Sequence, residues 1–396
     1  MCDQLCHPSR RDLLKLTALL GAGTSPLLRS LASRARAEPD APLRIGYLPI
    51  TDATPLLVAH DRGLFKAEGL EVEAPRMFRS WAQLVEAFVA GQVNAVHLLS
   101  PMTVWARFGS KVPAKVVAWN HVDGSALTVA PSVNAVADLG GKTVAVPFWY
   151  SIHNVVLQRL LASAGLRAVK GANPPAAKEV KLVVMAPSDM PPALAGGQIA
   201  GYIVAEPFNA AAEQLGVGKI LRFTGDVWRN HACCVVFMHE RDLTERAAWS
   251  EKVVSALVKA QLWTRGHRAE TAKLLSKAGK NKYTPHAPEV LAKVLAPSAS
   301  DRSKYQKDGA IKHADWNAQR IDFQPYPYPS YTEELIGLLK STLVDGDRAF
   351  LDKLDPKKAA AELVDDRFVR KAIEKLGGPK AFGLPESLTR SETIAV

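Results

Sequence analysis

Short strand-like segments alternate with longer helical segments through the first two thirds of this 396-residue chain, and this alternation limits the folds it can adopt. The expected strands are residues 43–49, 95–99, 115–119, 126–129, 143–147, 181–185, 201–205 and 220–223. Such an order is typical of α/β folds with mostly parallel sheets. The last third is a long helical region from Leu243, then a proline-rich stretch, then helix again to Gly377. We expect two α/β lobes, a helical C-terminal extension, and a loosely held tail over residues 378–396.

The first 37 residues have the pattern of an export signal. Ser9 to Lys15 reads S-R-R-D-L-L-K, a twin-arginine motif. The apolar run Leu16 to Leu28 that follows is too short to span a bilayer, and Ala35-Arg36-Ala37 is a small-x-small cleavage site. We therefore expect the mature protein to begin near Glu38 and to reach the periplasm by the twin-arginine route.

Charge, motifs and cysteine content narrow the function classes. The net charge of +11 falls to about +7 without the signal and forms no basic block, which argues against a nucleic-acid partner. The sequence contains no P-loop, G-x-G-x-x-G, G-x-S-x-G or H-E-x-x-H motif, so we expect a binding protein without a cofactor and not an enzyme. Removal of the signal leaves two adjacent cysteines, Cys233 and Cys234, which cannot form a disulfide framework.

Hydroxyl side chains and prolines at the expected helix starts are candidate ligand groups. In open α/β sheets, ligands bind beyond the carboxyl ends of the strands, where helix N-termini offer free N–H donors and partial positive charge. Five such junctions are Thr54, Ser80, Ser100, Ser151 and the Glu206-Pro207 step. Each alone is typical of an ordinary helix cap. Several of them facing one cleft would form a site for a small anion or zwitterion.

Several segments spread over most of the chain match one family in order and spacing. They are R-I-G-Y-L-P-I-T-D-A-T-P-L-L-V-A-H-D-R-G-L-F (44–65), S-W-A (80–82), H-L-L-S-P-M (97–102), M-A-P-S-D-M-P-P-A-L-A-G-G-Q-I-A-G-Y-I-V-A-E-P-F-N (185–209), V-W-R-N-H (227–231) and D-F-Q-P-Y-P-Y (322–328). In these segments the chain resembles the periplasmic solute-binding proteins of ABC importers in the nitrate and bicarbonate group, which are related to the sulfonate and taurine binders.

The resemblance implies a type II periplasmic binding protein fold, whose two lobes close on a ligand about a hinge with two crossovers. It places lobe 1 at residues 43–127 and 237–377 and lobe 2 at residues 128–236, with crossovers near Ser125–Val129 and Val235–His239. The ligand implied is a small nitrogen- or sulfur-containing anion or a related metabolite. The implied partners are a permease and an ATPase in the inner membrane, and the protein is expected to be a monomer.

The same resemblance implies a set of ligand-binding positions. These are Trp81, His153 and Glu206, with the loops at Thr51-Asp52 and at His97 to Ser100 lining the same cleft. The full set of expected ligand residues is Thr51, Asp52, Trp81, His97, Ser100, Tyr150, His153, Glu206, Cys233 and Cys234. Trp81 either stacks on a flat ligand or anchors the core, and His153 either donates to an anion or is an ordinary histidine. Glu206 accepts from an ammonium group, binds a divalent cation, or caps its own helix.

One departure from the family concerns the ligand. Nitrate and bicarbonate binders tend to carry H-P-E-K where this chain reads His231-Ala232-Cys233-Cys234, so two thiols replace an acid and a lysine. A larger or less charged ligand, such as a sulfonate, an amide or a pyrimidine-like compound, then becomes plausible. We expect the thiols to be buried small residues, with a vicinal disulfide or a soft-metal site with Met238 or His239 as alternatives. Strand alternation opposes the metal site because neighbours face opposite sides, so no metal ligands are expected.

Two further function classes stay open at this stage. An enzyme on the same scaffold, such as a relative of thiamin-pyrimidine synthases, would need clustered histidine and cysteine residues. A sensory or chaperone-like receptor would bind the same kind of ligand but report it to a partner instead of a transporter.

Overall fold

The computed structural model describes residues 41–171, 173–313, 316 and 319–396. The twin-arginine motif and the cleavage site that we expect in residues 1–37 lie outside the described residues. Within the described part of the chain, no helix is both long enough and apolar enough to cross a membrane.

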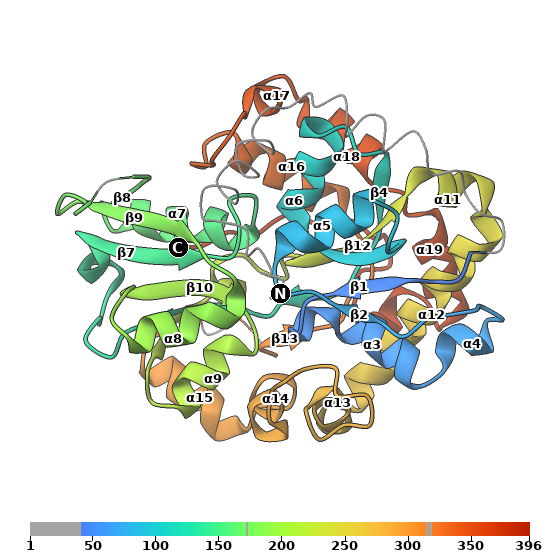
Figure 1. The fold of residues 1–396 in the computed structure, drawn as a ribbon, viewed down its shortest axis with the longest axis horizontal. Helices are drawn as coiled ribbons and strands as arrows, with labels where there is room; N and C mark the ends of the chain where they lie inside the picture. Colours follow the sequence, from blue (N-terminus) through green and yellow to red (C-terminus); the bar gives the residue numbers. More distant parts are fainter. Residues whose placement is uncertain (1–40, 172, 314–315, 317–318) are drawn as a thin grey trace, which may run out of the picture.

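Two β-sheets with helices packed around them form the two lobes (Figure 1). The first sheet has the strand order β2-β1-β3-β12-β4, and the second has the order β11-β6-β10-β7-β9-β8. The first consists of β1 (Ile45–Tyr47), β2 (Arg76–Met77), β3 (Ala95–Leu99), β4 (Ala114–Trp119) and β12 (Cys234–His239). The second consists of β6 (Ser125–Val129), β7 (Lys142–Val146), β8 (Arg167–Val169), β9 (Glu179–Val184), β10 (Gly201–Ala205) and β11 (Lys219–Phe223).

Both sheets are mixed. In the first, β1 is parallel to β2 and β3, whereas β12 is antiparallel to β3 and β4. In the second, β7 is parallel to β9 and β10, whereas β6 is antiparallel to β10 and β11. The predicted α/β fold with two lobes is thus confirmed, and the antiparallel strands are those that enter a sheet after a crossover. Every residue of β3, β6, β10 and β12 is buried, as expected for strands covered on both faces.

Helices cover the sheets and form the C-terminal extension (Figure 1). Those up to β12 are α3 (Thr54–Asp61), α4 (Leu64–Ala67), α5 (Trp81–Val89), α6 (Ser100–Val104), α7 (Ile152–Ser163), α8 (Met190–Ala195), α9 (Phe208–Gln214) and α10 (Thr224–Val227). Those after it are α11 (Glu240–Glu245), α12 (Ala247–Gly266), α13 (Arg268–Leu275), α14 (Pro288–Leu295), α15 (Ala299–Lys307), α16 (Pro329–Leu339), α17 (Ala349–Asp352), α18 (Pro356–Leu363) and α19 (Arg367–Lys375). Shorter turns are η1 (Thr51–Ala53), η2 (Trp105–Gly109), η3 (Val136–Leu139), η4 (Pro187–Asp189) and η5 (Pro379–Phe382).

Two of the four predicted hydroxyl caps are confirmed. Ser80 Oγ accepts from the Gln83 N–H at 3.3 Å at the start of α5, and Ser151 Oγ accepts from the Asn154 N–H at 3.1 Å at the start of α7. Thr54 and Ser100 are instead the first residues inside α3 and α6. Their hydroxyls donate to backbone carbonyls, and the cap positions are taken by Ala53 at the end of η1 and by Leu99 at the end of β3.

The two crossovers run side by side between the lobes. β6 pairs with β10 and β11 and β12 pairs with β3 and β4, so the chain passes between the lobes through residues 120–124 and 224–233. The segments that we expected to be crossovers, 125–129 and 235–239, are thus sheet strands, and each connection lies a few residues earlier. A bridge between Val122 and Ala232 joins the two crossovers. A third strand supports them, because β5 (Val122–Asp123) also pairs with β13 (Ile321–Asp322).

The C-terminal tail is packed and not loose as we expected. Phe382 is fully buried, and Trp228 Nε1 in the second crossover donates to Glu392 Oε2 at 2.8 Å. The Arg229 N–H donates to the Thr393 carbonyl at 3.0 Å, and Ile394 forms a β-bridge with Trp228. The prediction rested on the position of these residues at the end of the chain, and it missed the contacts that residues 392–395 make with the second crossover.

Candidate functional site

A cluster of fully buried polar side chains lies where the first sheet meets both crossovers. We call it the junction cluster, and its members are Asp52, His97, His121, His153, His231, Cys233 and Cys234, each with 0 % of its surface exposed. Asp52 is in η1 just after β1, His97 is in β3, and His121 lies between β4 and β5. His153 is in the first turn of α7, and residues 231–234 lead into β12. The topology therefore gathers titratable groups from both lobes at one buried point.

The chain bends at Cys233, and this bend brings the two thiols to the same side. Regular pairing in β12 begins only at Cys234, which lies opposite Leu99 of β3. The Ser100 N–H holds the bend by donating to the Cys233 carbonyl at 2.8 Å. Alternation of neighbours applies within a strand, so our argument that the two thiols point in opposite directions was wrong. Both cysteines are free and buried, which confirms the expected burial.

The thiols have other neighbours than the sequence suggested. One ligand-type atom each from Asp52, His121, Cys233 and Cys234 lies within 4.8 Å of all the others. The alternative with His239 is wrong, because the His239 ring stacks on Phe88 at 4.0 Å and its Nε2 lies 3.1 Å from the Phe88 carbonyl. Met238 lies opposite Ala95, four residues beyond Cys234 in β12. The sequence hypothesis considered only partners in the same strand as the thiols. The observed neighbours are Asp52 in η1 and His121 in the other crossover.

Asp52 and His121 form a buried ion pair. His121 Nε2 lies 3.0 Å from Asp52 Oδ2 and 3.3 Å from the Cys234 backbone nitrogen, and we assign its proton to the shorter carboxylate contact. Burial raises the pKa of the Asp52 carboxyl to about 6. Burial also disfavours the charged imidazole, but the charge and hydrogen bond of Asp52, together with Cys233, raise the pKa of His121 to about 10.

Trp81 and His97 present two buried donors that have no partner among the described residues. The Leu48 N–H donates to His97 Nε2 at 2.8 Å, and burial lowers the pKa of His97 to about 3, so the ring is neutral and its proton is on Nδ1. Neither His97 Nδ1 nor Trp81 Nε1 has a hydrogen-bond acceptor within the part of the chain that is described. The two rings lie 5.4 Å apart. Buried donors are normally paired, so a ligand oxygen placed here would complete both.

His153 and Ser125 bring the second lobe into the cluster. His153 Nε2 lies 2.9 Å from Ser125 Oγ and 3.7 Å from Cys233 Sγ. Ser125 Oγ in turn lies 3.8 Å from the same sulfur. Because α7 and β6 belong to the second lobe, the two contacts with Cys233 change when the lobes move relative to each other, whereas the contact between His153 and Ser125 stays within the second lobe.

The remaining predicted residues have structural partners. Thr51 donates through its N–H and its hydroxyl to the Glu206 carbonyl at 3.0 and 3.1 Å, which joins the two lobes. Glu206 pairs with Arg320 and also accepts from the Ala210 N–H at 3.1 Å, so it caps its own helix. Ser100 Oγ donates to the Ala232 carbonyl at 2.9 Å. Tyr150 packs between Trp105 and Phe350.

The sequence reasoning missed His121 altogether. Its signal was its position directly after a buried strand and at the start of a crossover, where side chains from both lobes meet. Ser125 and His231 were named only as parts of longer segments. His231 Nε2 lies 2.8 Å from Thr224 Oγ1, and burial lowers its pKa to about 3, so it enters the cluster as a neutral ring.

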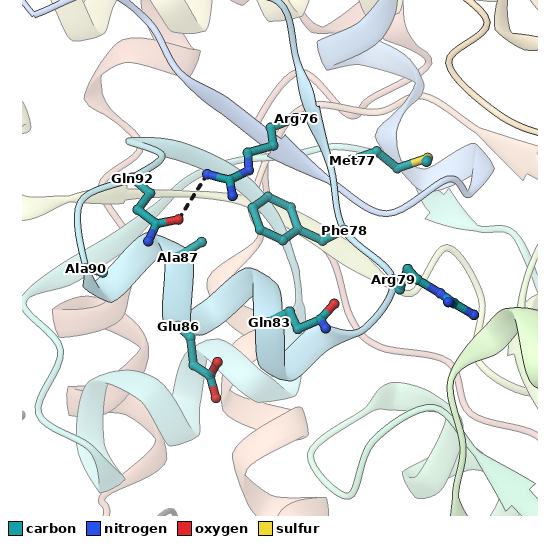
Figure 2. A pocket seen from close by; sticks show the side chains of 9 residues that line it. All are labelled: Arg76, Met77, Phe78, Arg79, Gln83, Glu86, Ala87, Ala90 and Gln92. Carbon is teal, nitrogen blue, oxygen red and sulfur yellow. Dashed lines mark hydrogen bonds between the residues drawn. The ribbon is translucent and has the colours of Figure 1, made fainter. Parts of the chain in front are cut away.

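Two cavities in the protein lie outside the junction cluster. One of about 460 Å³ lies beside β2 and α5 and is shown in Figure 2. There Arg76 donates to Gln92 Oε1 at 3.0 Å and lies over the Phe78 ring, and acidic and basic side chains share the rim. Another of about 530 Å³ lies beside the hinge strands β5 and β13, next to Asp123 and Arg268. None of the predicted ligand residues lines either of these two cavities.

Comparisons with known proteins agree on the family and the fold. The model of the NMT1-like family matches residues 36–278. The chain is 24 % identical over 316 residues to the nitrate/nitrite binding protein NrtA of Nostoc, covering 73 % of this chain and 68 % of the relative. It is 26 % identical over 391 residues to the bicarbonate-binding protein CmpA of Synechococcus, covering 88 % and 81 %. It also matches 36 % of the length of the nitrate import ATP-binding protein NrtC of Synechocystis, at 27 % identity over 58 % of this chain.

Solved structures show the same architecture. The periplasmic nitrate-binding protein NrtA from Synechocystis superposes with a TM-score of 0.70 at 18 % identity, covering 89 % of this chain and 93 % of that one. The desulfurization enzyme DSZB superposes with a TM-score of 0.52 at 15 % identity, covering 84 % and 99 %. At these identities the likeness establishes the periplasmic binding protein fold and leaves the ligand to be argued from the site.

Proposed function

The chain belongs to the NMT1-like family, and from this premise we propose that it is the substrate-binding component of an ABC importer. It binds a small nitrogen- or sulfur-containing anion or a related metabolite between its lobes and delivers it to a permease. The names of the relatives NrtA and CmpA, which are binding proteins, support this proposal, as does the two-lobed fold with a hinge. The match to an import ATP-binding protein supports an ATPase as a partner. The twin-arginine motif supports a periplasmic location.

The unpartnered donors of Trp81 and His97 are the observation that carries the proposal. An unmade hydrogen bond at a buried donor costs about 1–3 kcal/mol, and a ligand oxygen recovers that free energy on binding. Both donors are neutral, and the charge of His121 in the same cluster is already compensated by Asp52, so the site favours an oxygen acceptor with little charge over a compact, strongly charged anion. Among the ligands that we considered, this favours amides and pyrimidine-like compounds over nitrate, bicarbonate and sulfonates, each of which carries a full negative charge.

Replacing Trp81 by phenylalanine is expected to weaken ligand binding by roughly 5- to 150-fold, because it removes one donor and keeps an aromatic ring. The measurement is calorimetric titration with nitrate, bicarbonate, taurine, alkanesulfonates, urea derivatives and pyrimidines, after a thermal-shift screen for ligands that raise the melting temperature. Trp263→Phe is the matched control. Trp263 lies on the outer helix α12, where its ring stacks on His267 and the guanidinium of Arg62 lies over it. Equal affinities of Trp81→Phe and the unaltered protein would exclude this placement of the site.

An enzyme on the same scaffold is the second candidate, and the clustering of histidine and cysteine around Cys233 favours it. The fold is also found in the desulfurization enzyme DSZB. The two functions differ in what happens to a bound ligand. A transport component releases it unchanged, so chemical conversion of any ligand found in the screen would replace the transport proposal by the enzymatic one.

A further inference from the structure

We propose that Asp52, His121, Cys233 and Cys234 together form a binding site for one Zn²⁺ ion between the two crossovers. This inference goes beyond the proposed function, because it concerns a resident ion and does not depend on which molecule is transported. It also replaces our sequence expectation that the two thiols bind no metal.

The four side chains lie close enough together to bind one tetrahedral ion. The four ligand atoms lie within 4.8 Å of one another, and all four residues are fully buried. Bond lengths of about 2.0–2.3 Å at a tetrahedral zinc place ligand atoms about 3.3–3.8 Å apart, so shifts of about half an ångström per side chain complete the site. The ligands come from three separate segments, which makes their convergence a property of the fold.

The unpartnered atoms in the cluster point to a ligand that the protein itself does not supply. Neither carboxylate oxygen of Asp52 has a well-aligned hydrogen bond among the described residues; the contacts of the carboxylate are the ion pair of Oδ2 with His121 and the neighbouring Cys234 thiol. The Nδ1 atom of His121 also lacks a hydrogen-bond partner among the described residues. A buried carboxylate with unused oxygens is costly unless a cation binds it. The charged imidazole opposite offers only partial compensation, since it makes one contact with one of the two oxygens.

The thiols supply the soft part of the ligand set. Both cysteines are free and buried, and Cys233 Sγ lies 3.7 Å from His153 Nε2 and 3.8 Å from Ser125 Oγ. Zinc binds cysteine as the thiolate, so binding of an ion would release the thiol protons.

The ligand set selects a divalent ion over copper(I). Two thiolates, one imidazole and one carboxylate suit the borderline ion Zn²⁺, whereas copper(I) prefers sulfur and nitrogen ligands. The two thiolates and the carboxylate carry three negative charges. A divalent ion leaves one negative charge in the buried site and a monovalent ion leaves two, and uncompensated buried charge is strongly unfavourable.

The position of the site gives the ion a mechanical role. Asp52 belongs to the first lobe, His121 to the first crossover, Cys233 to the end of the second crossover, and Cys234 to the start of β12 in the first lobe. An ion bound by all four fastens both crossovers to the first lobe. His153 and Ser125 of the second lobe lie 3.7 and 3.8 Å from Cys233 Sγ and move when the lobes open. The ion thus stiffens the hinge on one side and leaves the second lobe free to close.

The test is metal titration of the full mature protein, reduced and then freed of metal with a chelator. We expect binding of one Zn²⁺ per chain, a melting temperature raised by a few degrees, and thiolate-to-metal charge-transfer absorption when Co²⁺ replaces Zn²⁺. Cys233→Ser and Asp52→Asn are each expected to weaken Zn²⁺ binding at least about 100-fold. Met238→Leu and His239→Gln are the matched controls. Both side chains lie further along the same strand, so the Zn²⁺ affinity of these variants should equal that of the unaltered protein.

Several results would overturn the zinc site. One is the absence of Zn²⁺ binding by the reduced protein, and another is a Co²⁺ spectrum without thiolate charge transfer. Zn²⁺ affinities that do not change in Cys233→Ser and Asp52→Asn would have the same meaning, provided that urea unfolding shows both variants to be folded. Failure of the transport proposal looks different: Trp81→Phe and the unaltered protein would then have equal affinities for the organic ligand or anion, while Zn²⁺ binding would stay intact.

Discussion

Replacing Arg320 by methionine is expected to lower the free energy of unfolding by about 3–5 kcal/mol, the largest effect of a single substitution that we predict here. Arg320 is 3 % exposed and pairs with Glu206, which is 1 % exposed. Its guanidinium also donates to Tyr305 Oη at 3.0 Å and lies 3.7 Å from Glu213. Methionine fills a similar volume but leaves the Glu206 carboxylate buried without its cation. Urea unfolding at neutral pH measures the loss.

The pH dependence of the same variant has a defined sign. Burial already raises the pKa of Glu206 in the folded protein, and Arg320 opposes that shift. Without Arg320 the folded state binds a proton that the unfolded state has lost, so stability falls as the pH rises above the pKa of the unfolded carboxyl. The deficit of Arg320→Met is therefore expected to be larger at about pH 8 than at about pH 5.

Two controls make the prediction specific to the buried pair. The double variant Glu206→Gln with Arg320→Met should recover part of the lost stability, because it removes the stranded charge. Lys304→Ala breaks the pair with Asp308, in which both side chains are largely exposed, and should cost less than about 1 kcal/mol. A loss in Arg320→Met no larger than that in Lys304→Ala would show that the buried pair does not stabilise the fold.

The fold was predictable because its signals are local. Short, mostly apolar buried strands, such as the five-residue strands β3 and β10, are visible in the sequence, and serine caps such as Ser80 and Ser151 mark real helix starts. The crossovers were misplaced by a few residues because an apolar run marks a strand, whereas the connection between lobes is the polar stretch that precedes it. The packed tail was missed for a related reason, since its backbone pairs with a segment far away in the sequence.

The candidate site was predictable only where family likeness named it. Trp81, His97 and His153 were expected and lie in or beside the junction cluster. The grouping of Asp52, His121 and the two thiols could not be derived, because it depends on the bend at Cys233 and on two crossovers lying side by side. Strand alternation predicts that the side chains of Cys233 and Cys234 point to opposite sides, whereas the bend brings them together. A bend at one residue leaves no clear signal in a sequence.

Removing residues 389–396 is expected to lower the free energy of unfolding by about 2–4 kcal/mol and to loosen the second crossover. The deletion takes away the Glu392 acceptor of Trp228, which is fully buried. It also removes the Ala395 N–H that donates to the Val227 carbonyl at 2.7 Å and the Arg390 guanidinium that lies over the Tyr328 ring. Urea unfolding measures the first effect.

The second effect tests whether the tail supports the site and not only the fold. Residues 227–233 lead directly to the thiols, so amide exchange in this segment should become faster, and both ligand and Zn²⁺ affinity should fall although no ligating residue is deleted. Glu386→Ala, at an exposed position of the same tail, should change none of these quantities. If the shortened protein lost stability but kept the exchange rates of residues 227–233 and both affinities, the tail would stabilise the fold without positioning the cluster. The strands that flank the second crossover would then be sufficient to hold Cys233 in place.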